Sequence, residues 1–520
     1  MALDRRDFLA RGGLTLAAAA VLGPEALAAR PEVESRATPL TWRGVRSQFR
    51  LRSDRVHLGA FLLASHPAPV RAAIERHRRA FDADPVGYLH GQELRREAAV
   101  LGAAAAYTGA RPADIALTDS TTMGLGLLYN GIHVREDQEL LTSTHDFFVT
   151  HDALDLKAAR TGASLRKIPL YEQSAAASAD EIVRRVVAAV TPRTRVVALT
   201  WVHSSTGVKL PIAAIARALA PLNRGRTEAD RILLCVDGVH GVGIENVRLP
   251  DLGCDFFATG CHKWLFGPRG TGLVWGRPGA WQHVTHTIPS FTVSGTPGGA
   301  MTPGGFHSFE HRWALAEAFR FHRRIGKARI AARTHTLNSR FKSGLAAMRH
   351  VSLRTPRAPS LSAGLVCFAV QGMPPAEVVD RLLQRGIIAT VTPYADALAG
   401  GAEHPEHAGR DRPGPTGDPD AGLRAGSAAR DGGDEPDLRG RLERRLEIVG
   451  LHAVYVHVHE RPQFAALVEE QVAHRQLAQR LAHRRRVDLE ATFAARLAGE
   501  QRREEDHCHS AASTERIVGR

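Results

Sequence analysis

The sequence contains few cysteines and lysines, and it lacks a long hydrophobic run. Only five of the 520 residues are cysteine, and none forms a C-x-x-C pair or a cluster with metal-ligand spacing. This pattern argues against a disulfide framework and against a structural metal site. Beyond the N-terminus no segment reaches the ~20 consecutive apolar residues of a membrane-spanning helix. We therefore expect no stable membrane span.

Basic residues are abundant but not clustered. The formal net charge is +14, and six of the 68 basic residues are lysine. Arginine is spread along the chain, without a basic block interleaved with aromatic residues, which argues against nucleic-acid binding. A content of 44% hydrophobic and 23% charged residues is ordinary for a globular protein. A chain of this length is expected to hold two or more domains.

The N-terminal segment, residues 1–29, is typical of an export signal. An Arg-Arg pair at residues 5–6 is followed by a short apolar run at residues 14–22 and a cleavage-like Ala-Leu-Ala triplet at residues 26–28. We predict a twin-arginine signal peptide, with a periplasmic or exported protein as the consequence. The twin-arginine export machinery would then be a partner. An amphipathic N-terminal helix is the alternative.

The middle of the chain predicts an α/β fold. Residues 30–95 form an N-terminal segment, and residues 96–310 alternate short apolar strands with helices. This alternation indicates a large domain with a doubly wound, mostly parallel sheet, whose sites lie at the carboxyl ends of the strands. Residues 311–396 predict a long helical stretch and a smaller α/β domain that is incomplete.

The composition changes at about residue 397. Residues 397–520 contain no lysine but 19 arginines, and their first part is rich in Gly, Pro and Asp. Two interpretations remain open: a natural, irregular and disordered tail, or a shift of reading frame near residues 395–400 in a GC-rich gene. We favour the frame shift. Resequencing the gene tests it, because another frame should then encode a strand-and-helix ending.

One lysine stands where a free amine would be useful. Lys263 follows an apolar strand-like run, adjoins His262 and precedes the Gly-rich segment GPRGTG. Arginine stays protonated in proteins, whereas a partly buried lysine can lose its proton. A lysine retained amid so much arginine therefore suggests Schiff-base chemistry.

Three further clusters follow predicted strands. Ser120, Thr121 and Thr122 begin a helix, where hydroxyl and N–H groups can hold a phosphate, although an ordinary helix cap is the alternative. Asp237 ends an apolar strand and could keep a pyridinium nitrogen protonated, or could cap a turn. His145 ends another strand and could stack on a flat ring, although a lone histidine at such a position is more often structural.

The combination resembles a known family. Ser120-Thr121-Thr122, His145, Asp237-x-x-His240 and His262-Lys263 followed by GPRGTG are similar to the class V aminotransferase family of pyridoxal-phosphate enzymes. The HKWLFGPRGTG run is most similar to the isopenicillin N epimerase-like branch. The resemblance covers about residues 50–395. It implies the fold type I architecture with a seven-stranded large domain, a smaller C-terminal domain, and a homodimer with active sites at the interface.

The resemblance also implies roles for individual residues. Lys263 would form the Schiff base with pyridoxal 5'-phosphate and move the α-proton, Asp237 would pair with the pyridine nitrogen, and His145 would stack on the ring, with Phe148 as the alternative. The remaining positions implied to hold the cofactor are Ser120, Thr121, Thr122, Ser204, His240, His262 and Arg312. Of these, Thr121, Thr122 and His262 would hold the phosphate. Arg312, or alternatively His311, would reach the phosphate of a partner subunit.

Two departures from the family pattern affect the expected function. The catalytic cysteine loop of desulfurases has no counterpart, since Cys367 lies in an apolar strand-like run. The arginine that binds the substrate carboxylate in relatives would fall where the sequence pattern is lost, after residue 396. We expect an enzyme acting at Cα of an amino acid or derivative, of epimerase, aminotransferase or lyase type. A cofactor-binding but inactive relative, or an exported binding protein unrelated to the cofactor, are the alternatives.

Overall fold

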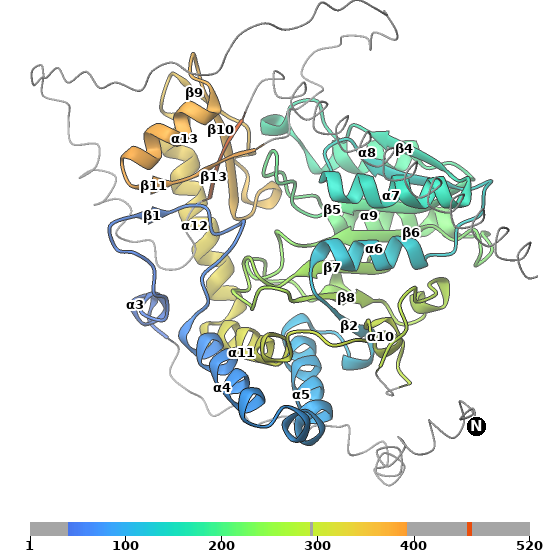
Figure 1. Cartoon of the computed structure of the whole chain (residues 1–520). Helices are drawn as coiled ribbons and strands as arrows, with labels where there is room; N and C mark the ends of the chain where they lie inside the picture. The colour runs from blue at the N-terminus through green and yellow to red at the C-terminus, as the bar shows by residue number, and fades with distance from the viewer. Residues whose placement is uncertain (1–39, 292–294, 393–454, 460–520) are drawn as a thin grey trace, which may run out of the picture. The chain divides into compact units, whose positions relative to one another are not determined.

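The computed structural model describes residues 40–291, 295–392 and 455–459 (Figure 1). A seven-stranded sheet in the order β2-β8-β7-β6-β5-β3-β4 forms its largest part. Every strand pair is parallel except those of β8 with β2 and β7. The predicted α/β fold with a mostly parallel sheet is confirmed. The strands are β2 (Ile115–Thr118), β3 (Glu139–Ser143), β4 (Ser164–Ile168), β5 (Thr194–Thr200), β6 (Leu233–Asp237), β7 (Phe256–Gly260) and β8 (Gly272–Gly276).

Both faces of this sheet are covered, which explains why its strands are continuous apolar runs. All seven residues of β5 are buried, as expected for a parallel strand with helices on each side. Val197 and Leu199 point into one core, which also contains side chains of α8 and α9, whereas Val196 and Ala198 point into a second core with α6 and α7. The sheet is therefore doubly wound. These helices are α6 (Thr121–Gly131), α7 (Phe148–Thr161), α8 (Ala179–Ala189) and α9 (Ile212–Leu219).

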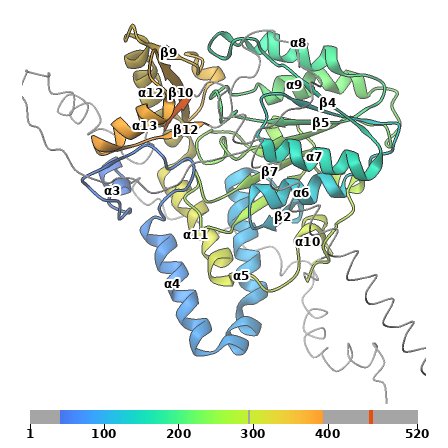
Figure 2. The same cartoon turned by 45° about the horizontal axis from the view of Figure 1, so that its top comes forward.

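A group of long helices packs together beside the sheet (Figure 2). Helix α11 contacts both α4 and α5, and α12 follows α11 directly. Gly109 ends α5 in the left-handed conformation with φ of 74°, which glycine adopts without strain. Among the described residues, no helix has the length and apolar character needed to cross a membrane. The long helices are α4 (Ala68–Ala83), α5 (Pro85–Thr108), α11 (Phe309–Ile325) and α12 (Lys327–Ala346). Two short helices, α3 (Trp42–Arg46) and α10 (Pro297–Met301), lie outside this group, and α10 contacts β2.

A smaller sheet follows α12. Its order is β12-β13-β10-β9, with β13 parallel to both of its neighbours. Strand β13 comes from residues 397–520, so five residues of the predicted tail join this sheet. The rest of that segment and the predicted signal peptide lie outside the described residues. The elements are β9 (Val351–Leu353), β10 (Leu365–Val370), α13 (Pro375–Gln384), β12 (Thr390–Thr392) and β13 (Tyr455–His459), with a parallel pair β1 (Val56–His57) and β11 (Ile387–Ile388).

Short 3-10 helices complete the described elements. They occupy connections between the main strands and helices, as such turns commonly do. They are η3 (Pro112–Asp114), η4 (Ser174–Ala176), η5 (Ala220–Asn223), η6 (Leu249–Leu252), η7 (Ala280–His283) and η8 (Pro359–Leu361).

A buried histidine in the helical group predicts acid sensitivity. His77 on α4 is 2% exposed; its Nδ1 lies 2.9 Å from the Tyr88 hydroxyl, and its ring meets Trp313 edge-on. Burial lowers the pKa of His77 to about 4. The unfolded chain, with an ordinary pKa near 6.5, takes up the proton first, so the free energy of unfolding falls as the pH drops from about 6.5 to 4.

We therefore expect His77→Gln to reduce the loss of stability between pH 7 and pH 5 by about 2 kcal/mol. Urea denaturation at both pH values measures this difference, whatever the variant's stability at pH 7. His90→Gln, on the exposed side of α5, is the control. An unchanged pH dependence in His77→Gln would contradict the prediction.

Candidate active site

Lys263 lies in the loop between β7 and β8, close to a histidine. Its Nζ is 3.3 Å from Nε2 of His240, and Nδ1 of His240 accepts a hydrogen bond of 3.1 Å from the indole N–H of Trp264. An indole nitrogen can only donate, so the proton of a neutral His240 ring is on Nε2 and points to Lys263. Only an unprotonated amine can accept it. Burial also lowers the pKa of Lys263 to about 8.

Asp237 ends β6 and is 2% exposed. Its Oδ1 accepts a hydrogen bond of 3.0 Å from the backbone N–H of Val239. Burial raises the pKa of Asp237 to about 6, although the nearby Lys263 opposes the shift. A buried carboxyl group with a raised pKa is suited to bind a cation, because a cation beside it restores its charge.

The turn after Asp237 depends on glycine. A Cβ atom on Gly238 would lie only 1.7 Å from Cζ of Phe257. Only glycine at residue 238 therefore lets the chain pass this close to β7. The resulting turn places Asp237 and His240 at the same edge of the sheet as Lys263.

The start of α6 is the predicted binding site for the phosphate group. The hydroxyl of Ser120 accepts a hydrogen bond of 3.0 Å from the N–H of Met123, so Ser120 serves as the helix cap. By contrast, Oγ1 of Thr121 is buried without a hydrogen-bond partner among the described residues. A Cβ on Gly260 would be 2.9 Å from this oxygen and 3.0 Å from Cε1 of His262. Thr121 and His262 therefore lie on either side of a narrow space at the N-terminus of α6. Such a space suits a phosphate group.

Two other residues of the predicted phosphate set are placed differently. Thr122 is exposed on the first turn of α6. Arg312 is 7% exposed, and its Nη2 lies 3.4 Å from Oδ1 of Asp119 in the same chain. Nδ1 of His311 lies 3.0 Å from the backbone oxygen of Arg269. Arg312 therefore lies beside the segment that leads into Ser120; whether it also reaches a partner subunit stays a prediction.

His145 follows β3 and is held against another aromatic residue. Its ring stacks on that of Tyr171 with centroids 3.9 Å apart and an interplanar angle of 9°. Burial lowers the pKa of His145 to about 3, so the ring is neutral at physiological pH. The alternative, Phe148, is 47% exposed at the start of α7. Of the two, His145 has the environment expected of a residue that stacks on a buried cofactor.

Ser204 lies in the turn after β5. Its backbone oxygen is 3.8 Å from Sγ of Cys367, on β10 of the smaller sheet. The four cysteines of the described residues are all buried as thiols, which agrees with their interpretation as core residues.

The structure adds residues that the sequence did not single out. Tyr171, His203 and Thr206 are buried beside His145, and Trp264 orients His240. Tyr171 and His203 come within three residues after the ends of β4 and β5. Their position near the carboxyl ends of strands was the available signal.

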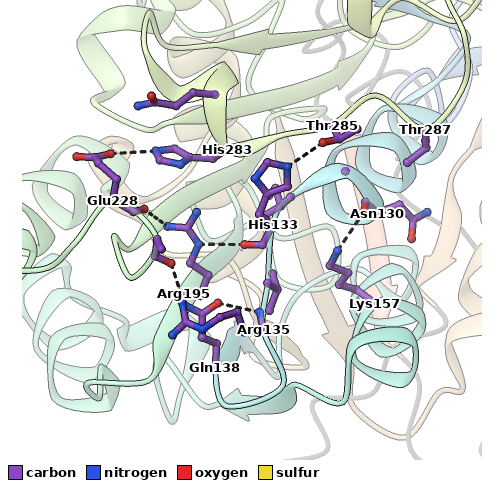
Figure 3. A pocket seen from close by; sticks show the side chains of 15 residues that line it. Asn130, His133, Arg135, Gln138, Lys157, Arg195, Glu228, His283, Thr285 and Thr287 are labelled. Carbon is purple, nitrogen blue, oxygen red and sulfur yellow. Dashed lines mark hydrogen bonds and ion pairs between the residues drawn. The ribbon is translucent and has the colours of Figure 1, made fainter.

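A separate pocket of about 720 Å³ lies near the amino ends of β3 and β5 (Figure 3). Arg195 in this pocket donates hydrogen bonds to the backbone oxygens of His133 and Glu228, and Lys157 donates to that of Asn130. These cationic side chains therefore connect neighbouring loops through hydrogen bonds to the backbone. None of the predicted site residues lines this pocket, because they lie beyond the opposite ends of the strands.

Comparison with known families agrees with this arrangement. Residues 97–392 match the family model described as aminotransferase class-V. The chain belongs to this family. Class V aminotransferases use pyridoxal phosphate. Three features fit that cofactor: the buried Thr121 hydroxyl group without a hydrogen-bond partner among the described residues, the Lys263 amine with its lowered pKa, and the buried carboxyl group of Asp237.

Individual relatives have several activities. The chain is 29% identical to the isopenicillin N epimerase of Streptomyces clavuligerus over 368 residues, which cover 66% of this chain and 88% of that protein. It is 30% identical over 297 residues to a probable cysteine desulfurase of Pseudomonas aeruginosa, covering 53% of this chain and 67% of that protein. Relatives within one fold family therefore carry different activities.

Solved structures confirm the fold. A complex of the cystine C-S lyase C-DES with cysteine persulfide superimposes with a TM-score of 0.58 at 22% identity, covering 65% of this chain and 90% of that one. The apo cysteine desulfurase of Thermococcus onnurineus gives a TM-score of 0.58 at 20% identity, covering 66% and 86%. The architecture is fold type I.

Proposed function

We propose that this chain is a pyridoxal-phosphate enzyme that breaks a bond at Cα of an amino acid or amino-acid derivative, with Lys263 as the attachment and proton-transfer residue. The observation that carries the proposal is the hydrogen bond between Lys263 and His240, which requires an unprotonated amine. When bound, the cofactor supplies an aldehyde for Schiff-base attachment and an electron sink for the charge left at Cα.

The chain's own residues then have distinct tasks. Asp237 would keep the ring nitrogen of the cofactor protonated, because a cation beside this buried carboxyl group opposes the rise in its pKa that burial causes. Thr121 and His262 would hold the phosphate together with the N–H groups of α6. His145 would stack on the ring.

Proton transfer is assigned to Nζ of Lys263. An amine whose pKa is lowered to about 8 by burial exists in both protonation states near neutral pH. It can take a proton from Cα and return it, which suits general acid–base catalysis. The contact with Nε2 of His240, at 3.3 Å, holds this amine in position.

Desulfurase chemistry is not part of the proposal. It needs an accessible thiolate as a nucleophile. Burial raises the pKa of Cys261 to about 12, and all four cysteines among the described residues are buried. Epimerisation, transamination and elimination remain compatible with the site, and the similarity to an isopenicillin N epimerase favours the first.

The absorption spectrum of the purified protein tests the proposal. We expect a visible band after addition of pyridoxal phosphate, and borohydride reduction that fixes the cofactor to Lys263 in the peptide map. A chromophore without turnover of any amino acid would support the inactive relative instead. A protein that binds no cofactor at all would contradict the proposal and favour an unrelated binding protein.

Two further features belong to the proposal. We propose a homodimer, supported by the family resemblance, and export by the twin-arginine route, supported by residues 1–29 of the sequence. Light scattering gives the oligomeric state. Replacement of the Arg-Arg pair by Lys-Lys should retain the protein in the cytoplasm if export occurs by that route.

A further inference from the structure

The ring of Tyr171 packs against that of His145. The two rings stack almost in parallel, with centroids 3.9 Å apart and an angle of 9°. Tyr171 itself is 1% exposed. The tyrosine ring therefore fixes the plane of the His145 ring.

The hydroxyl group of Tyr171 is itself anchored. It lies 2.9 Å from Nδ1 of His203 and 2.9 Å from Oγ1 of Thr206, both on the turn after β5. Nε2 of His203 lies 3.8 Å from Oδ1 of Asp146. All four side chains are buried. Because a buried hydroxyl group that loses its partners is costly, the tyrosine ring is held in one orientation.

Asp146 connects this network back to β3. Its Oδ2 accepts hydrogen bonds from the N–H of Ser143 at 2.8 Å and from the hydroxyl of Thr142 at 2.9 Å. A further hydrogen bond from the N–H of Thr200 reaches its other oxygen. Through these hydrogen bonds Asp146, the residue next to His145, links β3 to β5.

The His145 ring has one polar atom without a partner. Its Nε2 is buried and makes no hydrogen bond among the described residues. A buried polar atom without a partner is unusual and points to a missing ligand.

We propose that Tyr171 is a positioning residue for cofactor binding: it covers one face of the His145 ring and, through its anchored hydroxyl group, holds that ring in the plane needed to stack on the cofactor. This inference rests on the proposed function, in which His145 stacks on pyridoxal phosphate. Tyr171 touches no reacting atom and acts through His145 alone.

The affinity of the apo protein for pyridoxal phosphate tests the proposal. Titration followed by the circular dichroism of the bound cofactor gives the dissociation constant without any turnover. We expect Tyr171→Leu to raise the dissociation constant about 3- to 10-fold, the effect of losing one aromatic stack. Tyr171→Phe keeps the ring and should recover most of the affinity. The matched control is Phe148→Leu, an exposed aromatic residue on the neighbouring helix, which should change little.

A double-mutant cycle separates positioning from packing. If Tyr171 acts through His145, Tyr171→Leu should have no further effect on the dissociation constant in a His145→Ala background. An equal effect in both backgrounds would overturn the proposal and show a general packing role. The proposal would also be overturned if Phe148→Leu lowered the affinity for pyridoxal phosphate while Tyr171→Leu left it unchanged.

A second measurement remains if Tyr171→Leu fails to fold. Proton NMR of histidine-labelled wild-type apo protein, with His145 assigned by its absence in His145→Ala, reports the stack. We expect the His145 ring protons to show the upfield ring-current shift of protons above an aromatic face; unshifted protons would overturn the proposal. A wild-type protein that binds no pyridoxal phosphate would instead contradict the proposed function, while the NMR result would still decide whether the two rings stack.

Discussion

Lys263→Ala is expected to lose the covalently attached cofactor and to slow exchange of the Cα hydrogen of its substrate about 10³-fold or more. The variant removes both the attachment point and the base in one change. Its apo form should stay folded, because the chain loses a buried amine rather than an apolar core residue. The matched control is Lys167→Ala, which removes a lysine paired with Asp155 on the surface.

Deuterium exchange at Cα in heavy water, followed by proton NMR over a panel of amino acids, measures this effect. The assay does not depend on the reaction type, provided that the Cα–H bond breaks. The visible spectrum should shift to that of non-covalently held pyridoxal phosphate. Retention of a borohydride-fixed cofactor in Lys263→Ala would show that another amine is used, and the assignment would then be wrong.

The second large effect is expected for Asp237→Asn, with exchange slowed about 10²- to 10³-fold while the cofactor stays bound. Asparagine keeps the shape of the side chain and its hydrogen bond from Val239, but it cannot balance the positive charge of a protonated ring nitrogen. The ring then becomes a weaker electron sink. Binding is retained because Thr121, His262 and Lys263 are unchanged.

The spectrum and the exchange rate of Asp237→Asn together check this result. Asp237→Glu, which retains the charge, should lie between the wild type and Asp237→Asn. As a control, Asp255→Asn removes another buried carboxylate, one that pairs with Arg277 away from Lys263. It should lower stability but leave the spectrum unchanged. An exchange rate of Asp237→Asn equal to the wild-type rate would exclude the assigned role.

Several parts of the site followed directly from local sequence. Apolar runs with both faces buried, such as β5 and β6, indicated parallel strands, and polar residues after them indicated the functional edge of the sheet. Lys263 was identified by its chemistry, because lysine is rare in this chain. Ser120 had two possible roles in the sequence, and the structure assigns it the helix cap.

Other parts required the folded chain. Strand β13 pairs with β10 about ninety residues earlier, and no local pattern specifies that partner. Likewise, an isolated tyrosine and an isolated histidine after two different strands do not indicate a contact. Only the sheet order, which places β3 between β4 and β5, brings Tyr171 and His203 to His145.

The sequence by itself determined the fold class and singled out the candidate lysine and the residue types around it, because these depend on local periodicity and on the chemistry of single side chains. The tertiary structure decided the protonation states of those side chains and the neighbouring residues that hold them in place. Whether Lys263 is neutral depends on the tautomer of His240, which Trp264 sets. Such properties arise from burial and from partners distant in sequence, and these exist only when the chain is folded.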